Sequence, residues 1–185
     1  MNTADNEHDL LQLIGNNEPA ALRLMYSRYI RHLTAVCSRY IRNDEDAKDV
    51  LQESFLKIFG SIDRFVYKGE GSLKAWVTKI LVNEALKFIS RSGRLDFSPI
   101  SEENTDIGDD QPETTDIPAA IIHDFIRQLP DGYRIVFNLY AIEGKSHREI
   151  ASMLGIREST SASQLHRAKA LLASKIREYI NRRSS

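Results

Sequence analysis

One group of side chains near the middle of the chain has the types and spacing of a surface that binds an opened nucleic-acid strand. Lys79, Asn83, Lys87 and Arg91 follow one another at steps of four, so a helix would align them as one stripe. Trp76 borders this stripe, and a flat aromatic ring beside cations suits an unstacked base and its phosphates. The alternative is that Trp76 fills the core beneath a solvated lysine face. Residue types alone leave both interpretations open.

A second group has the pattern of a helix-turn-helix, between Ser146 and Lys169. Ser146 and Glu149 can form a capping box, and Gly155 permits the positive φ that a tight turn needs. Arginine can bond two acceptors of a guanine, while hydroxyl and imidazole groups suit base edges or phosphates. The alternative is an ordinary helical hairpin that binds no DNA, which the basic surroundings disfavour. The outward face of the helix after the turn would carry Ser163, His166 and Arg167.

A third group is acidic. Asp46, Asp49 and Glu53 are spaced by three and four, with Gln52 beside them. This face would repel DNA, so its functional interpretation is a contact with a basic protein partner. A solvated acidic face with no partner is the alternative.

Patterns typical of covalent chemistry are absent from the sequence. The five histidines, at positions 8, 32, 123, 147 and 166, show no metal-ligand spacing. We find neither a phosphate-binding glycine loop nor a nucleophile motif. The single cysteine, Cys37, falls in an apolar stripe, which predicts a buried structural thiol. The sequence therefore predicts a protein that is not an enzyme and has no cofactor, no metal and no small-molecule substrate.

Charge is distributed unevenly along the 185 residues, although the formal net charge is only -1. Residues 1–91 carry 13 basic and 12 acidic side chains, residues 92–120 carry one basic and eight acidic, and residues 121–185 carry 11 basic and six acidic. Three blocks of different charge indicate separate roles, and the basic last block favours a nucleic-acid partner. The polar, acidic N-terminus and the lack of an apolar run of about 20 residues predict a cytoplasmic protein without membrane insertion.

The elements that must position these groups all have helical periods. Residues 10–14 form a short apolar stretch, and Asn17 and Pro19 open a long helix. Asn43 or Asp44 can cap a third helix, and a fourth runs over about 72–90. The predicted inward face of the long helix comprises Leu22, Tyr26, Tyr29, Leu33, Val36, Cys37 and Tyr40.

The helical period stops between residues 92 and 118 and returns afterwards. That segment contains three prolines and two glycines together with the acidic excess, which predicts a flexible linker. After it come an apolar helix over 121–129, a second run with Ile135, Val136, Leu139 and Tyr140 inward, and the two helices around Gly155. The predicted fold class is all-α, with helical domains at 1–91 and 121–185 joined by the linker 92–120.

Five segments, in this order and at these spacings, closely resemble the extracytoplasmic-function sigma factors, a branch of the bacterial sigma-70 family. They cover nearly the whole chain, and their order is more specific than any single motif. The resemblance implies a promoter-specificity subunit of RNA polymerase, with core polymerase and promoter DNA as partners and an anti-sigma factor as an expected inhibitor. The segments are Asp46–Phe59, Gly71–Asn83, Leu129–Pro130, Glu143–Ile156 and Leu165–Lys169.

The same resemblance implies a role for each surface. The first domain would grip a coiled coil of the largest polymerase subunit through Asp46, Asp49, Gln52, Glu53 and Leu56. The segment 63–91 would bind and melt the minus-ten element through Trp76, Lys79, Asn83, Lys87 and Arg91, with a flipped base near the loop before Trp76. The linker would thread the channels of the polymerase. The last domain would bind the minus-thirty-five element through Thr160, Ser163, Gln164, His166, Arg167 and Lys169.

The start of the second helix of the helix-turn-helix departs from the family pattern. Ser161 stands where the family often has a buried valine, and Ala162 and Gln164 replace two usual cations. Upstream DNA affinity would then be weaker or the recognised sequence different. Two alternatives stay open: a helix-turn-helix regulator whose first domain senses a ligand or dimerises, and an interaction protein that binds polymerase or an anti-sigma factor without promoter activity.

Overall fold

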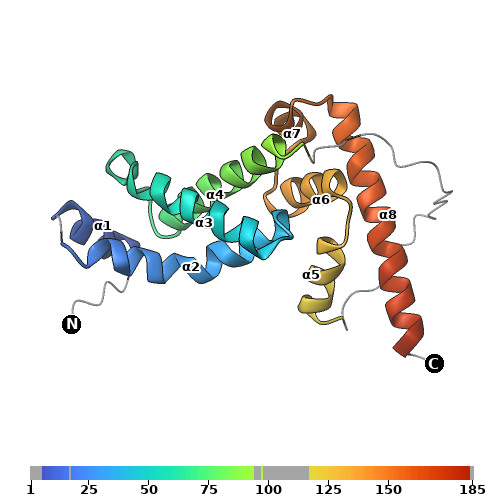
Figure 1. Cartoon of the computed structure of the whole chain (residues 1–185), viewed down its shortest axis with the longest axis horizontal. Coiled ribbons are helices and arrows are strands. Elements are labelled where there is room, and N and C mark those ends of the chain that lie inside the picture. Colours follow the sequence, from blue (N-terminus) through green and yellow to red (C-terminus); the bar gives the residue numbers. More distant parts are fainter. Residues whose placement is uncertain (1–5, 17, 94–96, 98–116, 184–185) are drawn as a thin grey trace. The chain divides into compact units, whose positions relative to one another are not determined.

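The computed structural model describes residues 6–16, 18–93, 97 and 117–183, and the chain divides into two compact units, Met1–Ile89 and Ser90–Ser185. All regular secondary structure in these residues is helical, so the predicted all-α class is confirmed. No helix in the described part combines the length and apolarity needed to cross a bilayer. In chain order the elements (Figure 1) are α1 (Glu7–Gly15), α2 (Ala21–Tyr40), α3 (Asp44–Phe59), η1 (Ile62–Arg64), α4 (Ser72–Arg91), α5 (Ala119–Arg127), α6 (Asp131–Phe137), η2 (Asn138–Ile142), α7 (His147–Leu154) and α8 (Glu158–Arg183).

Helix α2 buries a face that differs in part from the predicted one. Leu22 and Tyr26 were expected inward, but they are 42% and 46% exposed. The inward positions belong to Ala21 and Met25, which precede Tyr29 by eight and four residues. Leu22 and Tyr26 each lie one residue further along, about 100° around the helix. Tyr26 instead packs its ring against Phe55 of α3, with the ring centroids 4.6 Å apart.

Cys37 is buried in the α2–α3 contact, as predicted for a structural thiol. Its Sγ lies 3.7 Å from the carbonyl oxygen of Ala47. Burial raises the pKa of this thiol to about 12. A thiolate is therefore scarce at neutral pH, and the residue is inert.

Helix α3 starts at a side-chain cap. The Asn43 side chain accepts hydrogen bonds from the backbone N–H groups of Glu45 at 2.9 Å and Asp46 at 3.0 Å. Of the two predicted capping residues, the structure selects Asn43, because an amide oxygen at this position reaches the second and third N–H groups. The helix buries Val50, Leu51, Ser54, Phe55 and Ile58.

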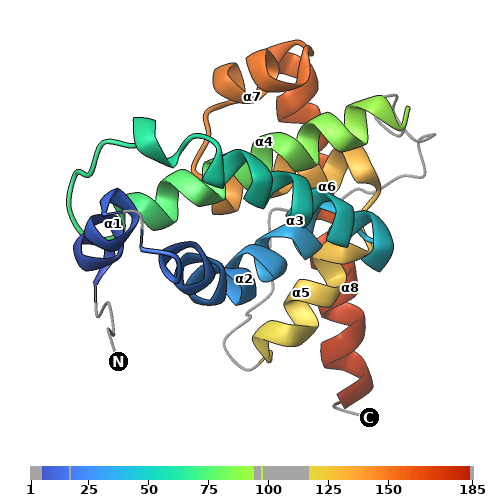
Figure 2. The same cartoon turned by 60° about the vertical axis from the view of Figure 1, so that its left-hand side comes forward.

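Helix α4 lies beside α3 (Figures 1 and 2) and buries a regular row of side chains. These residues recur at a strict step of four. They therefore share one side of the helix, and their direction turns gradually around the helix axis. Each is at most 3% exposed, which gives the first unit a continuous core along the whole helix. The row comprises Leu73, Val77, Leu81, Ala85 and Ile89.

The second unit is built around α8, which contacts α5, α6 and α7. Its apolar core joins Ile126, Leu129 and Tyr133 to Ala168 and Leu172 of α8. The predicted linker 92–120 lies mostly outside the described residues.

Tyr140 was predicted to face the core of the second unit, and this prediction is wrong, because it is 39% exposed. The backbone over Asn138–Ile142 is a π-helical turn. Such a turn holds more residues than an α-turn, so the period of 3.6 no longer assigns faces there. Leu139 stays buried, whereas Tyr140 turns outward.

Both local signals of the helix-turn-helix are confirmed. The Ser146 Oγ accepts from the Glu149 backbone N–H, and the Glu149 carboxylate accepts from the Ser146 N–H at 2.9 Å, which is the predicted capping box. The backbone N–H and the hydroxyl of Ser146 both donate to the Glu149 carboxylate, and these two bonds lower the pKa of that carboxyl. Gly155 has a φ of 68°, in the left-handed region that glycine enters without a steric penalty. α7 therefore ends at Leu154, and α8 can start after a short turn.

Candidate nucleic-acid interface

Helix α4 presents the predicted stripe on the side opposite its core. Lys79 follows the buried Val77 by two residues, and Asn83 follows the buried Leu81 by two, which is about 200° around the helix. Lys79, Lys87 and Arg91 are exposed, and Asn83 is half-buried. A helix with one apolar and one cationic side has the geometry for resting on a nucleic-acid backbone.

Trp76 lies at the edge between the two sides of α4 and is half-buried. Its ring packs against Phe65, with centroids 5.1 Å apart and planes tilted by 47°. Phe65 belongs to the loop after η1, and sequence reasoning did not single it out. The structure thus gives Trp76 an aromatic support on one side and leaves part of its ring accessible to a partner.

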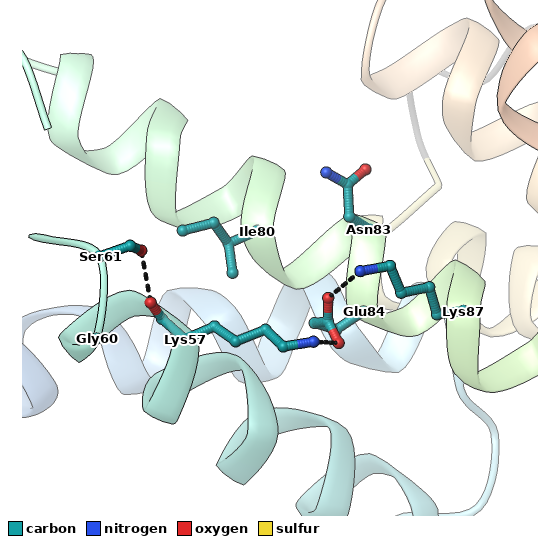
Figure 3. Close-up of a pocket in the computed structure, with 7 residues that line it drawn as sticks. All are labelled: Lys57, Gly60, Ser61, Ile80, Asn83, Glu84 and Lys87. Atoms are coloured by element: carbon teal, nitrogen blue, oxygen red, sulfur yellow. Dashed lines mark hydrogen bonds and ion pairs between the residues drawn. The ribbon is translucent and has the colours of Figure 1, made fainter. Parts of the chain in front are cut away.

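A shallow pocket opens where α4 meets the end of α3 (Figure 3). Lys57 of α3 and Lys87 of α4 both donate to the carboxylate of Glu84, and the Lys87 bond measures 3.0 Å. Glu84 is only 8% exposed. Asn83, Ile80, Gly60 and Ser61 complete the lining.

The two lysines keep Glu84 ionised. Burial alone would raise the pKa of this carboxyl, but the hydrogen bonds and charges of Lys57 and Lys87 outweigh it, and the net effect lowers the pKa. The hydrogen bond to Glu84 raises the pKa of Lys57 in turn. The sequence analysis singled out Lys87 but neither Lys57 nor Glu84. The available signal was that Glu84 is the sole acidic residue between Gly71 and Arg91.

The predicted acidic surface lies on one side of α3. Asp49, Gln52 and Glu53 are exposed, while Asp46 in the first turn is half-buried. Leu56 is 60% exposed and continues the same side one turn later. The surface therefore combines carboxylates with an apolar side chain, a composition suited to a protein partner. Glu53 also lies 3.6 Å from Lys57, which ties this surface to the pocket.

The second helix of the helix-turn-helix exposes most of its predicted DNA-binding residues. Ser163, His166 and Lys169 are exposed, and Thr160 and Arg167 are half-buried. The Lys169 Nζ lies 5.9 Å from the ring centroid of Tyr140. Arg167 follows Ser163 by four residues, so both lie on one side of α8.

Gln164 does not belong to this surface, which corrects the prediction for that residue. It is 1% exposed, and its Nε2 donates to the carbonyl oxygen of Phe97 at 2.9 Å. The reason is helical spacing: Gln164 stands three residues after Ser161 and four before Ala168, and both of these are fully buried. A cation at position 164 would therefore point inward.

Ser161, which departs from the family pattern, has a partner in the structure. It is fully buried, and its Oγ lies 2.9 Å from Nδ1 of His147 on α7. His147 also stacks on Tyr140, with ring centroids 4.8 Å apart. The hydroxyl thus makes a polar link between the two helices of the motif at a position where a valine would make an apolar one.

Within the described residues, no three His, Cys, Asp or Glu side chains come together in a way that could hold a metal ion.

Family profiles match both units of the chain. The profile described as Sigma-70 region 2 matches residues 25–95, and that described as Sigma-70, region 4 matches residues 119–172. The α4 stripe and the α3 surface lie in the first match. The helix-turn-helix up to Leu172 lies in the second.

Relatives of the same kind cover almost the full chain. The ECF RNA polymerase sigma-E factor of Haemophilus influenzae is 30% identical over 179 residues, which is 90% of this chain and 93% of the relative. The proteins of the same name from Salmonella typhimurium and Escherichia coli K12 are 27% and 26% identical, each over 94% of this chain and 95% of the relative.

Two solved structures are also similar. CnrH, in complex with the cytosolic domain of CnrY, shares 21% identity over 91% of this chain and 96% of its own, with a TM-score of 0.46. The sigma factor RpoE of Bartonella quintana, in complex with the anti-sigma factor NepR, shares 22% identity over 85% and 98%, with a TM-score of 0.49.

Proposed function

The chain belongs to the extracytoplasmic-function group of sigma-70 factors, and on that premise we propose which surface performs each step of promoter use. As a sigma factor it directs core RNA polymerase to promoter DNA and takes part in transcription initiation. Because sigma-70 regions 2 and 4 are both present in one chain, the alternative of a ligand-sensing helix-turn-helix regulator is disfavoured.

We propose that α4 binds and opens the minus-ten element. The observation that carries this assignment is the division of α4 into two opposite sides. One side is buried through the row that starts at Leu73 and ends at Ile89 in steps of four, and the other bears Lys79, Asn83, Lys87 and Arg91. Cations spaced one turn apart can follow successive phosphates of one strand. Trp76, supported from behind by Phe65, offers a ring on which an unstacked base can rest.

The side of α3 that carries Asp49, Gln52, Glu53 and Leu56, with Asp46 at its start, is proposed as the polymerase contact. Carboxylates around an exposed leucine suit a basic helical partner with an apolar seam. Since Lys57 of α3 donates to Glu84 of α4, the proposed polymerase contact and the proposed DNA stripe are directly linked within the first unit.

The exposed side of α8 is proposed to bind the minus-thirty-five element through Thr160, Ser163, His166, Arg167 and Lys169. Arg167 is the residue best suited to reading a guanine, since its guanidinium can make two parallel hydrogen bonds. Gln164 is left out of this proposal because it is buried.

The remaining parts of the proposal concern the setting of the protein. We assign residues 1–91 and 121–185 to the two functional domains and residues 92–120 to the connection between them. The chain would act in the cytoplasm, catalyse no covalent step of its own, and be held inactive by an anti-sigma factor. A partner that covered Leu56 and the carboxylates of α3 would block polymerase directly.

The proposal is tested by following promoter opening in reconstituted holoenzyme. Trp76→Ala and Asn83→Ala should preserve closed-complex binding but lower permanganate reactivity of thymines in the minus-ten region. Loss of one base–aromatic stack, worth about 1–3 kcal/mol, lowers opening ten-fold or more near the middle of that range. Lys74→Ala is the control, because Lys74 is an exposed cation of the same helix outside the stripe.

Normal thymine reactivity with a stably folded Trp76→Ala protein would show that the ring only fills space. Tight polymerase binding without any promoter opening by the unmodified chain would favour the interaction protein instead.

A further inference from the structure

Helix α4, which we propose opens the minus-ten element, has no side-chain cap from the residue that precedes it. The first backbone N–H groups of a helix have no partner inside the helix, and a Ser, Thr, Asp or Asn side chain just before it normally accepts from them. Gly71 occupies that position in α4 and has no side chain. The N–H of Ser72 donates to the carbonyl oxygen of Gly69, and that of Ala75 donates to Gly71. The N–H groups of Leu73 and Lys74 need another acceptor.

Glu7, the first residue of helix α1, supplies that acceptor. Its Oε2 accepts from Leu73 N at 2.9 Å, and its Oε1 accepts from Lys74 N at 2.8 Å. Oε1 also accepts from the hydroxyl of Tyr29 at 3.0 Å. Glu7 is 2% exposed and lies 66 residues before Leu73. Both oxygens of a buried carboxylate are thus directed at the positive end of α4, where negative charge is stabilising.

The same part of α1 holds the loop that leads into α4. The backbone N–H of Glu7 donates to Oε2 of Glu70 at 3.1 Å, and Arg28 of α2 lies 3.5 Å from the other oxygen of Glu70. The ring of His8 lies against that of Tyr67, with centroids 5.3 Å apart. Residues 65–71 are therefore attached to α1 and α2 on one side and, through Phe65, to Trp76 on the other.

We propose that Glu7 is a positioning residue for promoter opening, acting through the start of α4 and the loop 65–71 without touching DNA. This inference rests on the proposed function, in which Trp76 meets the opened strand. Trp76 follows Lys74 by two residues, so loosening of the first turn of α4 would move its ring away from Phe65. The N-terminal helix α1 then belongs to the melting apparatus, although it bears none of the DNA-facing side chains.

The test uses Glu7→Ala and Glu7→Gln in reconstituted holoenzyme. Core binding and closed-complex affinity should be unchanged. Permanganate reactivity of the minus-ten thymines should fall roughly five-fold with alanine, the scale of losing one helix cap, and less with glutamine, which keeps an acceptor but not the charge. Hydrogen exchange of the Leu73 and Lys74 amides should accelerate in the same order.

Cys37→Ala is the matched control, because Cys37 is equally buried in the first unit but lies far along α2 from the start of α4. It should lower stability without changing either readout at a temperature where all variants are folded. Equal loss of opening in this control would overturn the positioning role, as would normal opening by Glu7→Ala. Unchanged amide exchange in Glu7→Ala would overturn the cap itself. Failure of the proposed function is separate: Trp76→Ala would then open promoters normally, while the exchange measurement would still report the cap.

Discussion

Replacing Glu84 by glutamine separates the charge of this buried carboxyl from its shape. The carboxylate joins α4 to α3 through Lys57 and also accepts from Lys87 of α4 (Figure 3). Glutamine has nearly the same volume and retains one acceptor oxygen. What Glu84→Gln removes is the negative charge, which leaves two lysine ammonium groups facing each other across a neutral amide.

The expected cost follows from the exposure of the three side chains. Hydrogen bonds to a buried charged group contribute about 1.5–3 kcal/mol each, whereas exposed ion pairs contribute about 0.2–1 kcal/mol. The Glu84 side chain is 9% exposed, but the Lys57 and Lys87 side chains are 41% and 57% exposed, so solvent screens both pairs. We expect a loss of about 1–2 kcal/mol in the free energy of unfolding of the first unit. For a unit of fewer than 100 residues this corresponds to a Tm lower by roughly 5–10 °C.

The chain provides its own probe for this measurement. Trp76 is the single tryptophan and lies on α4, two turns before Glu84, so its fluorescence during urea or thermal unfolding reports on the first unit alone. Lys74→Gln is the matched control. It removes one charge from α4 as Glu84→Gln does, but Lys74 is exposed, and the described structure shows no side-chain ion pair for it.

The stability difference should depend on pH in a defined direction. The pKa of Glu84 is below its ordinary value of 4.5 in the folded chain, so its ionised form stabilises the fold above pH 4.5. That contribution is lost as pH falls through the lowered pKa. Unmodified protein and Glu84→Gln should therefore differ in stability at pH 7, and this difference should narrow as pH falls below 4.5. Equal stability at pH 7, or a difference that does not narrow as pH falls below 4.5, would refute the inference that charge pairing joins the two helices.

Three further predictions concern the partner surfaces. Asp49→Lys combined with Glu53→Lys should abolish association with core polymerase in pull-down experiments while circular dichroism stays unchanged, because charge reversal at a complementary surface costs several kcal/mol; unimpaired association would move the polymerase contact elsewhere. Arg167→Ala should lose about 1–3 kcal/mol of promoter affinity and relax preference at one base pair in selection from randomised minus-thirty-five elements; an unchanged preference would exclude base readout. Ala162→Lys should steepen the dependence of log affinity on log salt by about 0.9 in holoenzyme binding, since Ala162 is exposed. Identical slopes for Ala162→Lys and unmodified protein would mean that this position does not approach DNA. Gln164→Arg should instead lower stability, because Gln164 is buried.

Several features of this protein are determined by its sequence because the interactions behind them are local. The step of four from Lys79 to Arg91 places those side chains on one side of any helix, whatever packs against it. The Ser146–Glu149 cap spans three residues, and the positive φ of Gly155 is a property of glycine itself. Periodicity of 3.6 likewise predicts the all-α class, since it needs no knowledge of which helices touch.

Other features depend on which helices meet, and only the tertiary structure decides that. The bond from Leu73 to Glu7 joins residues 66 apart, and no spacing rule connects a carboxylate in one helix to the bare start of another. The same holds for the Lys57–Glu84 pair. Tyr140 and Gln164 show the limit within a single element. A π-turn changed the side on which Tyr140 lies, and Gln164 lies on the buried side of α8, where its amide donates to the carbonyl of Phe97. Helical period assigns a residue to a side of its helix, but its exposure is set by what the rest of the fold places against that side.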